Sequence, residues 1–214
     1  MRLTLRILSL LLVLSVTSTA LGASQRKVPA YEKYIKQYSS LAIQHQKKYR
    51  IPASITLAQG LLESGAGRSE LARKSNNHFG IKCHSDWRGG RVYHDDDLRG
   101  ECFRKYKNPE QSYEDHARFL VDRPRYASLF RLKVTDYKGW ARGLQKCGYA
   151  TDRAYANRLI KLIEDYDLYK YDRKGVYSER KLRKNPWLMN PHQIYIANDI
   201  ALSLIHISEP TRHL

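Results

Sequence analysis

Apolar and polar residues follow a helical spacing along the first half of the chain. Between residues 29 and 49, aromatic and aliphatic residues recur at steps of three and four, which is the spacing of one face of an amphipathic helix. The run ASITLAQGLLES at 53–64 is apolar around most of its circumference, and this pattern indicates a central helix buried on all sides. Pro52 suits a first helical turn, and Gly65 and Gly67 end the helix.

The pattern changes after a short predicted helix over residues 69–74, for which Ser69 is the expected cap. Between residues 76 and 106, short strand-like runs alternate with Gly, Asp and Asn, which predicts a small β-hairpin or a three-stranded lobe. The helical period then returns, and we predict further helices over residues 110–121, 136–146 and 152–166. Helices, a small β lobe and helices again make an α+β fold that is mainly α.

The N-terminal residues have the pattern of a secretory signal peptide. Arg2 and Arg6 precede an apolar run at 7–16, and small residues follow at 20–23. The apolar run is short for a membrane anchor, which is the alternative. We therefore expect residues 1–23 to be removed, leaving an exported protein that is periplasmic or extracellular and has no stable membrane insertion.

The remaining chain divides into three parts. Residues 24–170 carry the regular patterns and form one predicted domain. Residues 171–201 are basic and rich in turn residues, which is typical of a linker. Residues 202–214 include LSLIHISEPTR, which resembles a translated sequencing adaptor, so we exclude them from fold reasoning.

The chain is strongly basic, with a formal net charge of +17. A charge of this size favours anionic partners such as nucleic acid, a membrane surface or a cell-wall polymer. Export makes nucleic acid the weakest of these three, and no motif with base-reading logic is present. Nucleic acid is therefore not an expected partner, whereas a membrane surface and a cell-wall polymer both stay open at this point. We also expect a monomer.

The cysteines and histidines suggest one disulfide and no metal. The chain has three cysteines, Cys83, Cys102 and Cys147, and an exported protein can pair two of them. We favour the pair Cys83–Cys102, which could face each other across the predicted hairpin, although the other two pairings stay open. No CxxC or HExxH motif occurs, so we expect no metal ion and no cofactor.

Glu63 lies near the C-terminal end of the predicted buried helix, beside Leu61 and Leu62. Partial burial and the negative end of the helix dipole both disfavour a carboxylate there. Both effects raise the pKa, as a general acid requires at neutral pH. A glutamate at a helix end is more often a solvated surface group, so position alone does not establish a catalytic role.

Four ordered segments carry a family resemblance. They are LLESGAGRSELA at 61–72, SNNHFGIK at 75–82, ECFRKYKNPEQSYEDHARFL at 101–120 and GYATDRAYANRLIKLI at 148–163. Together they resemble the glycoside hydrolase family 73 N-acetylglucosaminidases across residues 29–170. The resemblance implies a lysozyme-like fold, with Glu63 of the ESG motif as proton donor. It also implies action on peptidoglycan glycan strands, between N-acetylglucosamine and N-acetylmuramic acid. Because relatives often carry a glycan-binding repeat after the catalytic domain, the resemblance implies as well that such a repeat followed residue 201 in the intact protein.

Glycosidases commonly use a second carboxylate. Glu101 is the candidate that the resemblance favours, because it lies just before Cys102 in the lobe expected to cover the cleft. Asp95, Asp96 and Asp97 lie on a nearby loop and could serve instead. We also count Asp97 among the expected substrate contacts.

The resemblance suggests further site residues. Asn76, Asn77 and Phe79 match a segment that lines the cleft, and we expect them to contact substrate, although the asparagines could instead cap turns. A tyrosine of the segment at 148–163 is expected to face Glu63. We favour Tyr149 as this catalytic tyrosine and place Tyr155 among the substrate contacts, unless it belongs to the helical core.

Two other functions are compatible with these residues. A lytic transglycosylase could use the same fold and a single glutamate, and its anhydro-sugar product would distinguish it. A non-catalytic glycan-binding module is the second alternative, and an intact Glu63 within an intact motif speaks against it.

Overall fold

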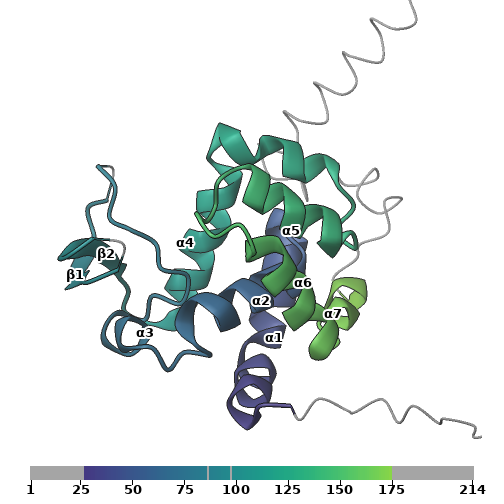
Figure 1. Ribbon diagram of the computed structural model, residues 1–214, viewed down its shortest axis with the longest axis horizontal. Coiled ribbons are helices and arrows are strands. Elements are labelled where there is room, and N and C mark those ends of the chain that lie inside the picture. The colour runs from purple at the N-terminus through teal and green to yellow at the C-terminus, as the bar shows by residue number, and fades with distance from the viewer. Residues whose placement is uncertain (1–26, 86, 97, 175–214) are drawn as a thin grey trace, which may run out of the picture.

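A computed structural model of the protein describes residues 27–85, 87–96 and 98–174 (Figure 1). The helices are α1 (Pro29–Tyr49), α2 (Ala53–Ser64), α3 (Glu70–Ser75), α4 (Pro109–Val121), the 3-10 helix η1 (Pro124–Arg131), α5 (Tyr137–Lys146), α6 (Tyr155–Asp165) and α7 (Tyr169–Lys174). The strands are β1 (Gly90–His94) and β2 (Glu101–Lys105). The order of elements confirms the predicted α+β fold with a lysozyme-like arrangement.

Helix α2 is the centre of the helical body. Helices α1, α5, α6 and α7 pack against it, and its side chains at Ile55, Leu57 and Leu61 are fully buried. The sequence produces this arrangement because α2 has no polar face to turn toward water. The burial of α2 confirms the prediction made from its apolar circumference.

Both ends of α2 are fixed by specific hydrogen bonds. At its start, the Ser54 N–H and hydroxyl donate to the carboxylate of Asp172 in α7, over 2.8 and 2.7 Å. The Ala53 N–H donates to Gln46 Oε1 over 2.7 Å. At its end, Gly65 takes a left-handed conformation at φ 55°. These contacts satisfy backbone groups that a helix leaves unpaired at its ends.

The β lobe lies to one side of the helical body and is reached through α3 (Figure 1). Strands β1 and β2 are antiparallel, with Tyr93 opposite Cys102. On the other edge of β2, Lys82 forms a single bridge with Phe103. The favoured disulfide, Cys83–Cys102, is present with 5.4 Å between Cα atoms. It ties the segment before the hairpin to β2, instead of joining the two hairpin strands.

The helix predictions are confirmed with three differences. Helix η1 was not predicted, because its eight residues carry too short a periodic pattern. Helix α6 begins at Tyr155, since Asp152 accepts the Ala154 N–H in a preceding turn instead of capping the helix. Helix α7 continues to Lys174, past residue 170 where we expected the linker to begin.

Some sequence predictions fall outside the described residues. These are the signal peptide at 1–23, the linker after residue 174, the segment at 202–214, and Asp97. Within the described part of the chain, no helix combines the length and the apolar character needed to cross a membrane.

Candidate active site

Glu63 lies one residue before the end of α2, where its side chain is partly buried. Burial raises the pKa of Glu63 to about 7, and the nearby charge of Asp96 acts in the same direction. A hydrogen bond from Tyr155 acts against this shift by stabilising the carboxylate. The result is a carboxylic acid that still holds its proton near neutral pH, the property that a general acid needs.

The turn after Glu63 uses three successive residues with positive φ. Gly65, Ala66 and Gly67 have φ of 55°, 60° and 74°. The Gly67 N–H donates to the Ser64 hydroxyl over 2.7 Å, which closes the turn back onto α2. Ala66 is the unusual member, since a Cβ atom disfavours this conformation by about 1–2 kcal/mol. The backbone therefore leaves α2 sharply and directly after the acid.

A chain of hydrogen bonds leads from the protein interior to Glu63. His116 Nε2 lies 3.1 Å from Gln59 Oε1, Gln59 Nε2 donates to the Tyr155 hydroxyl over 2.9 Å, and that hydroxyl donates to Glu63 Oε1 over 2.9 Å. Because Gln59 donates through its nitrogen, its oxygen is an acceptor and His116 Nε2 carries the hydrogen. Every bond in the chain therefore points its donor toward Glu63.

The interior of this chain is uncharged. His116 is fully buried, and burial lowers its pKa to about 3. Gln59 is fully buried as well. A neutral imidazole and a neutral amide can orient Tyr155 without placing a formal charge beneath Glu63. The chain thus fixes the direction of the Tyr155 hydroxyl, while burial dominates the electrostatics of the acid.

Two aromatic rings support the hydrogen-bond chain. Phe79 stacks on His116, with ring centroids 3.9 Å apart and planes 13° apart. Tyr149 stacks on Tyr155, at 5.6 Å and 23°. Among the described residues, the hydroxyl bound to Glu63 is that of Tyr155, whereas we favoured Tyr149 for this position. Both tyrosines belong to the same segment, and sequence spacing did not decide between them.

The structure corrects the expected substrate contacts of Asn77 and Phe79. Their exposed fractions are 1% and 3%. The Asn77 carboxamide accepts from the Ile81 N–H and donates to the carbonyls of Ile81 and Arg104. Its hydrogen-bonding groups are therefore satisfied within the protein, and no surface is left for a sugar. Asn77 instead fixes the loop that places Phe79 against His116.

Asn76 lies elsewhere than expected. It ends α3 in a left-handed conformation at φ 54°, and its side chain donates to the Tyr106 carbonyl over 3.1 Å. It lines a hollow between α1 and α3, together with His78 and Tyr34. The segment at 75–82 therefore contacts two regions: Phe79 packs against His116, and Asn76 lines the hollow.

Glu101 begins β2, and hydrogen bonds hold its carboxylate in place. Lys82 Nζ donates to Glu101 Oε1 over 2.8 Å, and the Leu98 N–H donates to Oε2 over 3.2 Å. The Glu101 side chain is 15% exposed. Lys82 also lies 3.8 Å from Asp96. One lysine therefore holds two of the candidate carboxylates of the β lobe.

The carboxylates of this loop have different surroundings. Asp96 is the member whose charge acts on Glu63. Asp95 Oδ1 accepts the Gly100 N–H over 2.7 Å, which is a contact within the loop. Asp97 lies outside the described residues. Of the described carboxylates in this lobe, Asp96 is therefore the one whose charge reaches Glu63, and the role of Glu101 stays a prediction.

Sequence reasoning missed Gln59, His116 and Lys82. Gln59 could have been found, because it is a polar residue in an otherwise apolar helix and stands four positions before Glu63, on the same helix face. His116 and Lys82 carried no comparable signal, since their partners are distant in sequence.

A helical body with an acid at the end of its buried central helix, and a small β lobe beside it, defines the lysozyme-like class of fold. Residues 39–168 match the glucosaminidase family model, described as mannosyl-glycoprotein endo-beta-N-acetylglucosaminidase. The chain belongs to this family.

Relatives of known name agree with this membership. The chain is 39% identical over 140 residues to exo-glucosaminidase LytG of Bacillus subtilis, covering 59% of this chain and 48% of that protein. It is 32% identical over 147 residues to peptidoglycan hydrolase FlgJ of Vibrio parahaemolyticus, covering 64% of this chain and 47% of that protein. The chain thus spans about half the length of the curated relatives it matches.

Solved structures show the same fold. The catalytic domain of the autolysin Auto from Listeria monocytogenes matches with a TM-score of 0.58 and 33% identity, covering 69% of this chain and 90% of that one. A peptidoglycan hydrolase from Sphingomonas sp. A1 matches with a TM-score of 0.58 and 32% identity, covering 69% and 96%.

Proposed function

We propose that the protein is an exported glycoside hydrolase that cleaves peptidoglycan between N-acetylglucosamine and N-acetylmuramic acid. Family membership and the names of the relatives support this substrate. The reaction takes place at the cell wall, requires no cofactor or metal, and is carried out by a monomer that does not bind nucleic acid. The strong positive charge favours adsorption to an anionic wall.

The observation that carries the proposal is the raised pKa of Glu63, about 7, caused by burial at the end of α2. In the proposed mechanism, Glu63 gives its proton to the glycosidic oxygen as the bond to the sugar breaks. Tyr155 holds the carboxyl group in one orientation and then stabilises the carboxylate that proton transfer leaves. Tyr149 keeps Tyr155 in position through ring stacking.

We propose Glu101 as the second carboxylate, which stabilises positive charge on the sugar ring or activates water. The hydrogen bonds from Lys82 and the Leu98 N–H orient the Glu101 carboxylate. Asp96 is the alternative, because its charge acts on Glu63. If Glu101 has this role, Glu101→Gln lowers kcat far more than Asp96→Asn does; the reverse ranking transfers the role to Asp96.

The decisive experiment compares the protein with its Glu63→Gln variant on purified peptidoglycan. Released fragments are reduced with borohydride and identified by mass spectrometry. We expect reduced N-acetylglucosamine ends, and a loss of about 10²–10⁴-fold in rate for Glu63→Gln. Glu164→Gln is the matched control, since Glu164 is an exposed helical glutamate. Equal activity in both variants would remove Glu63 from the mechanism.

The same products test the competing reactions. Anhydromuramic ends identify a lytic transglycosylase, and binding without release identifies a glycan-binding module. The relative from Bacillus subtilis is named an exo-glucosaminidase, whereas the family description names an endo activity. We propose endo cleavage, which releases long fragments early; steady release of disaccharides alone would indicate exo cleavage.

A further inference from the structure

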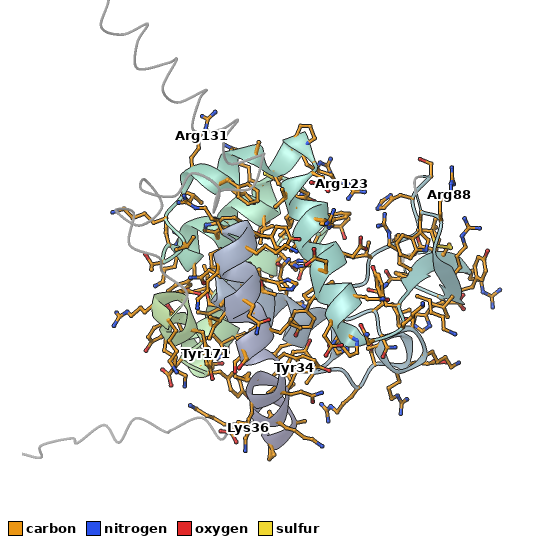
Figure 2. All side chains as sticks on the ribbon, turned by 180° about the vertical axis from the view of Figure 1, so that it is seen from behind. Tyr34, Lys36, Arg88, Arg123, Arg131 and Tyr171 are labelled. Carbon is orange, nitrogen blue, oxygen red and sulfur yellow. A yellow bond between two sulfur atoms is a disulfide. The ribbon has the colours of Figure 1, made fainter. Side chains whose placement is uncertain are left out.

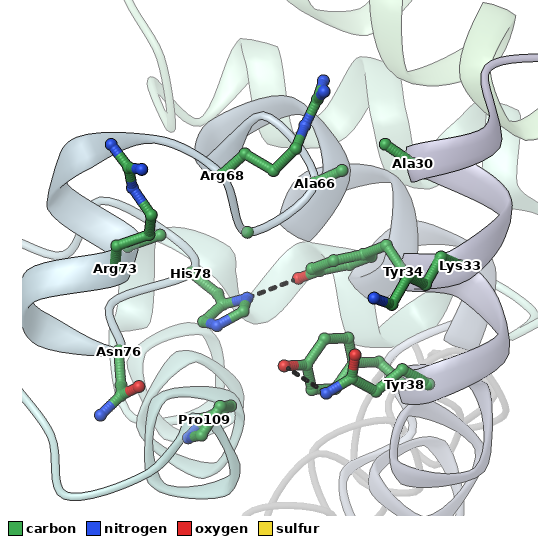
Figure 3. A pocket seen from close by; sticks show the side chains of 13 residues that line it. Ala30, Lys33, Tyr34, Tyr38, Ala66, Arg68, Arg73, Asn76, His78 and Pro109 are labelled. Carbon is green, nitrogen blue, oxygen red and sulfur yellow. Dashed lines mark hydrogen bonds between the residues drawn. The ribbon is translucent and has the colours of Figure 1, made fainter.

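The hollow between α1 and α3 that Asn76 lines has a volume of about 330 Å³ and lies behind the turn that follows Glu63 (Figure 3). It is enclosed by the first half of α1, by α3 and by the turn at Ala66, Gly67 and Arg68. Glu63, Tyr155 and Glu101 are not among its lining residues. The hollow is therefore distinct from the group of residues that surrounds the proposed acid, although the same turn borders both.

The edge of the hollow is positively charged. Lys33, Arg68 and Arg73 come from three different segments and all line it, and Figure 3 shows the two arginines at its margin. No salt bridge is formed by these three side chains within the described residues, and the Arg68 Nε–H donates only to the Gly65 carbonyl. The lining includes no carboxylate. Glu110 is the acidic residue whose charge reaches the floor of the hollow, at His78 and Tyr38.

The floor of the hollow includes the imidazole of His78, which is held by a pair of buried tyrosines. The Tyr113 hydroxyl donates to Tyr34 over 2.8 Å, and the Tyr34 hydroxyl lies 2.9 Å from His78 Nδ1 (Figure 3). With Tyr34 donating, His78 Nδ1 is an acceptor and Nε2 carries the hydrogen. His78 is only 4% exposed, and burial lowers its pKa to about 4. Within the described residues its Nε2 has no hydrogen-bond partner and is not fully enclosed, so this atom can donate to a group held in the hollow that His78 lines.

We propose that this hollow binds an oxyanion, a carboxylate or a phosphate, carried by a polymer of the cell wall. Guanidinium groups pair with both anions through two parallel hydrogen bonds, and His78 Nε2–H supplies a neutral donor from the floor. The volume corresponds to about eleven water molecules at the density of the liquid, which is room for the anion and a few attached atoms.

The wall as the source of the anion rests on the proposed function. Peptidoglycan supplies carboxylates on its peptide stems, and phosphodiester-linked wall polymers supply phosphates. Gly67 lies in the turn that directly follows Glu63 and also lines the hollow. An anion held in the hollow would therefore fix the position of this turn. The hollow thus provides a second point of attachment beside the bond to be cut.

The test measures binding to purified cell walls by variants that cannot hydrolyse them, with Glu63→Gln as the background. The pair Lys33→Gln/Arg73→Gln removes two charges at the hollow. The matched pair Arg131→Gln/Lys133→Gln removes two exposed charges at the opposite end of the helical body, where Figure 2 shows Arg131 far from Tyr34. We expect about five- to thirty-fold weaker binding for the first pair and less than about two-fold for the second.

Equal weakening by both pairs would overturn the proposal, because it would mean that net charge alone governs adsorption. Walls treated with hydrofluoric acid, which removes phosphodiester-linked polymers, distinguish the sources. If Lys33→Gln/Arg73→Gln still binds treated walls more weakly than its background does, the ligand is a peptide carboxylate. If the two proteins bind treated walls equally, the ligand is a phosphate.

Binding of small soluble anions tests the site in the absence of the cell wall. Titration with inorganic phosphate and with succinate, followed through the His78 imidazole by NMR, should shift the His78 resonances in the protein and not in Lys33→Gln/Arg73→Gln. No shift with either anion would also overturn the proposal. If the unaltered protein binds either anion at this site but releases no sugars from peptidoglycan, the proposed function fails and the anion site stands.

Discussion

At the scale of single residues, the candidate site depends on which tyrosine contacts Glu63. The structure gives this contact to the first residue of α6, Tyr155, and places Tyr149 behind it. The proposed acid could be named from the sequence because the ESG motif carries the family resemblance, while the position of Glu63 at the end of a buried helix predicts only that its pKa is raised. The tyrosine could not, since the choice depends on how α6 crosses the end of α2, a packing outcome that no local pattern records.

Replacing Tyr155 by Phe should shift the pH dependence of the reaction upward. The Tyr155 hydrogen bond lowers the pKa of Glu63, so its loss raises that pKa above about 7. A general acid works while it is protonated, and the alkaline limb of kcat/KM should therefore move to higher pH. We also expect a rate loss of about tenfold or more, because the carboxyl group loses its orientation.

Tyr137→Phe is the control for this shift. Tyr137 also donates to a glutamate, Glu164, over 3.1 Å, but at an exposed position. Its pH profile should match that of the unaltered protein. An alkaline limb that stays in place in Tyr155→Phe would mean that Glu63 does not set it.

Gln59→Leu should also shift the alkaline limb of kcat/KM, although Gln59 does not contact Glu63 directly. The variant leaves His116 Nε2 and Tyr155 without their buried partner, which costs about 2–3 kcal/mol of unfolding free energy. A freed Tyr155 spends less time directed at Glu63, so the alkaline limb should shift in the same direction as in Tyr155→Phe. Gln44→Leu, at an exposed position of α1, is the control. A stability loss with an unchanged limb would assign Gln59 a structural role alone.

At the scale of elements, the helices that surround α2 were predictable, and the links between them were not. Periodicity located α1, α2, α4 and α5 because each buries a long face. The linker prediction was wrong at its start, since α7 is short and its one buried polar group, Asp172, has its partner in α2. Such an element is held by contacts with α1 and α2, whose residues are more than 100 positions away in the sequence, and local sequence gives no sign of them.

The Asp172 contact should give a measurable pH dependence of stability. Burial raises the pKa of Asp172 from 3.8 to about 6. The folded protein then binds the proton more tightly than the unfolded chain, so this group's contribution to stability falls as pH rises from about 4 to 6. Asp172→Asn cannot titrate. We subtract the unfolding free energy of Asp172→Asn from that of the unaltered protein. This difference should fall by about 2 kcal/mol between pH 4 and pH 6.

Urea unfolding of both proteins at pH 4 and pH 7 measures this difference. Glu63 also titrates with a raised pKa, but it is present in both proteins and cancels. A difference that grows with pH would mean that the Ser54 donors and the start of α2 outweigh burial and favour the carboxylate.

The disulfide should stabilise the β lobe. Cys83 and Cys102 are 19 positions apart, and closing a loop of this length contributes about 3 kcal/mol in the chain-entropy view. The double variant Cys83→Ser/Cys102→Ser should lose about this much stability. It should also lose activity, because Glu101 adjoins Cys102. Cys147→Ser, which removes the free cysteine, should change neither; an equal loss there would point to cysteine burial instead of the cross-link.

At the scale of the whole molecule, two surfaces meet at the turn after Glu63. One carries the acid and faces Asp96 of the β lobe. The other carries Arg68 and Gly67 and faces the hollow behind. The motif at 75–82 serves both, since Phe79 supports the hydrogen-bond chain to Glu63 while Asn76 and His78 line the hollow. This one stretch of sequence therefore contributes to both surfaces, and the prediction that it contacts sugar covers only part of its role.

The position of α7 leads to a prediction about the minimal active unit. The family match ends at residue 168, but the carboxylate that caps α2 is contributed by Asp172. A protein of residues 27–174 retains every described contact, whereas residues 27–168 lack the cap. Losing two buried hydrogen bonds at a helix start costs about 2–4 kcal/mol, and α2 carries Glu63 at its other end. We expect the shorter protein to unfold at lower urea concentration and to hydrolyse peptidoglycan more slowly.

Asp172→Ala in residues 27–174 separates the cap from the rest of α7. If the cap is the cause, this single substitution reproduces most of the stability lost in the shorter protein. If it reproduces little, the apolar contacts of α7 with α1 and α2 hold the central helix, and Asp172 is incidental. In either case the acid at one end of α2 depends on what is packed at the other, because a buried helix moves as a unit.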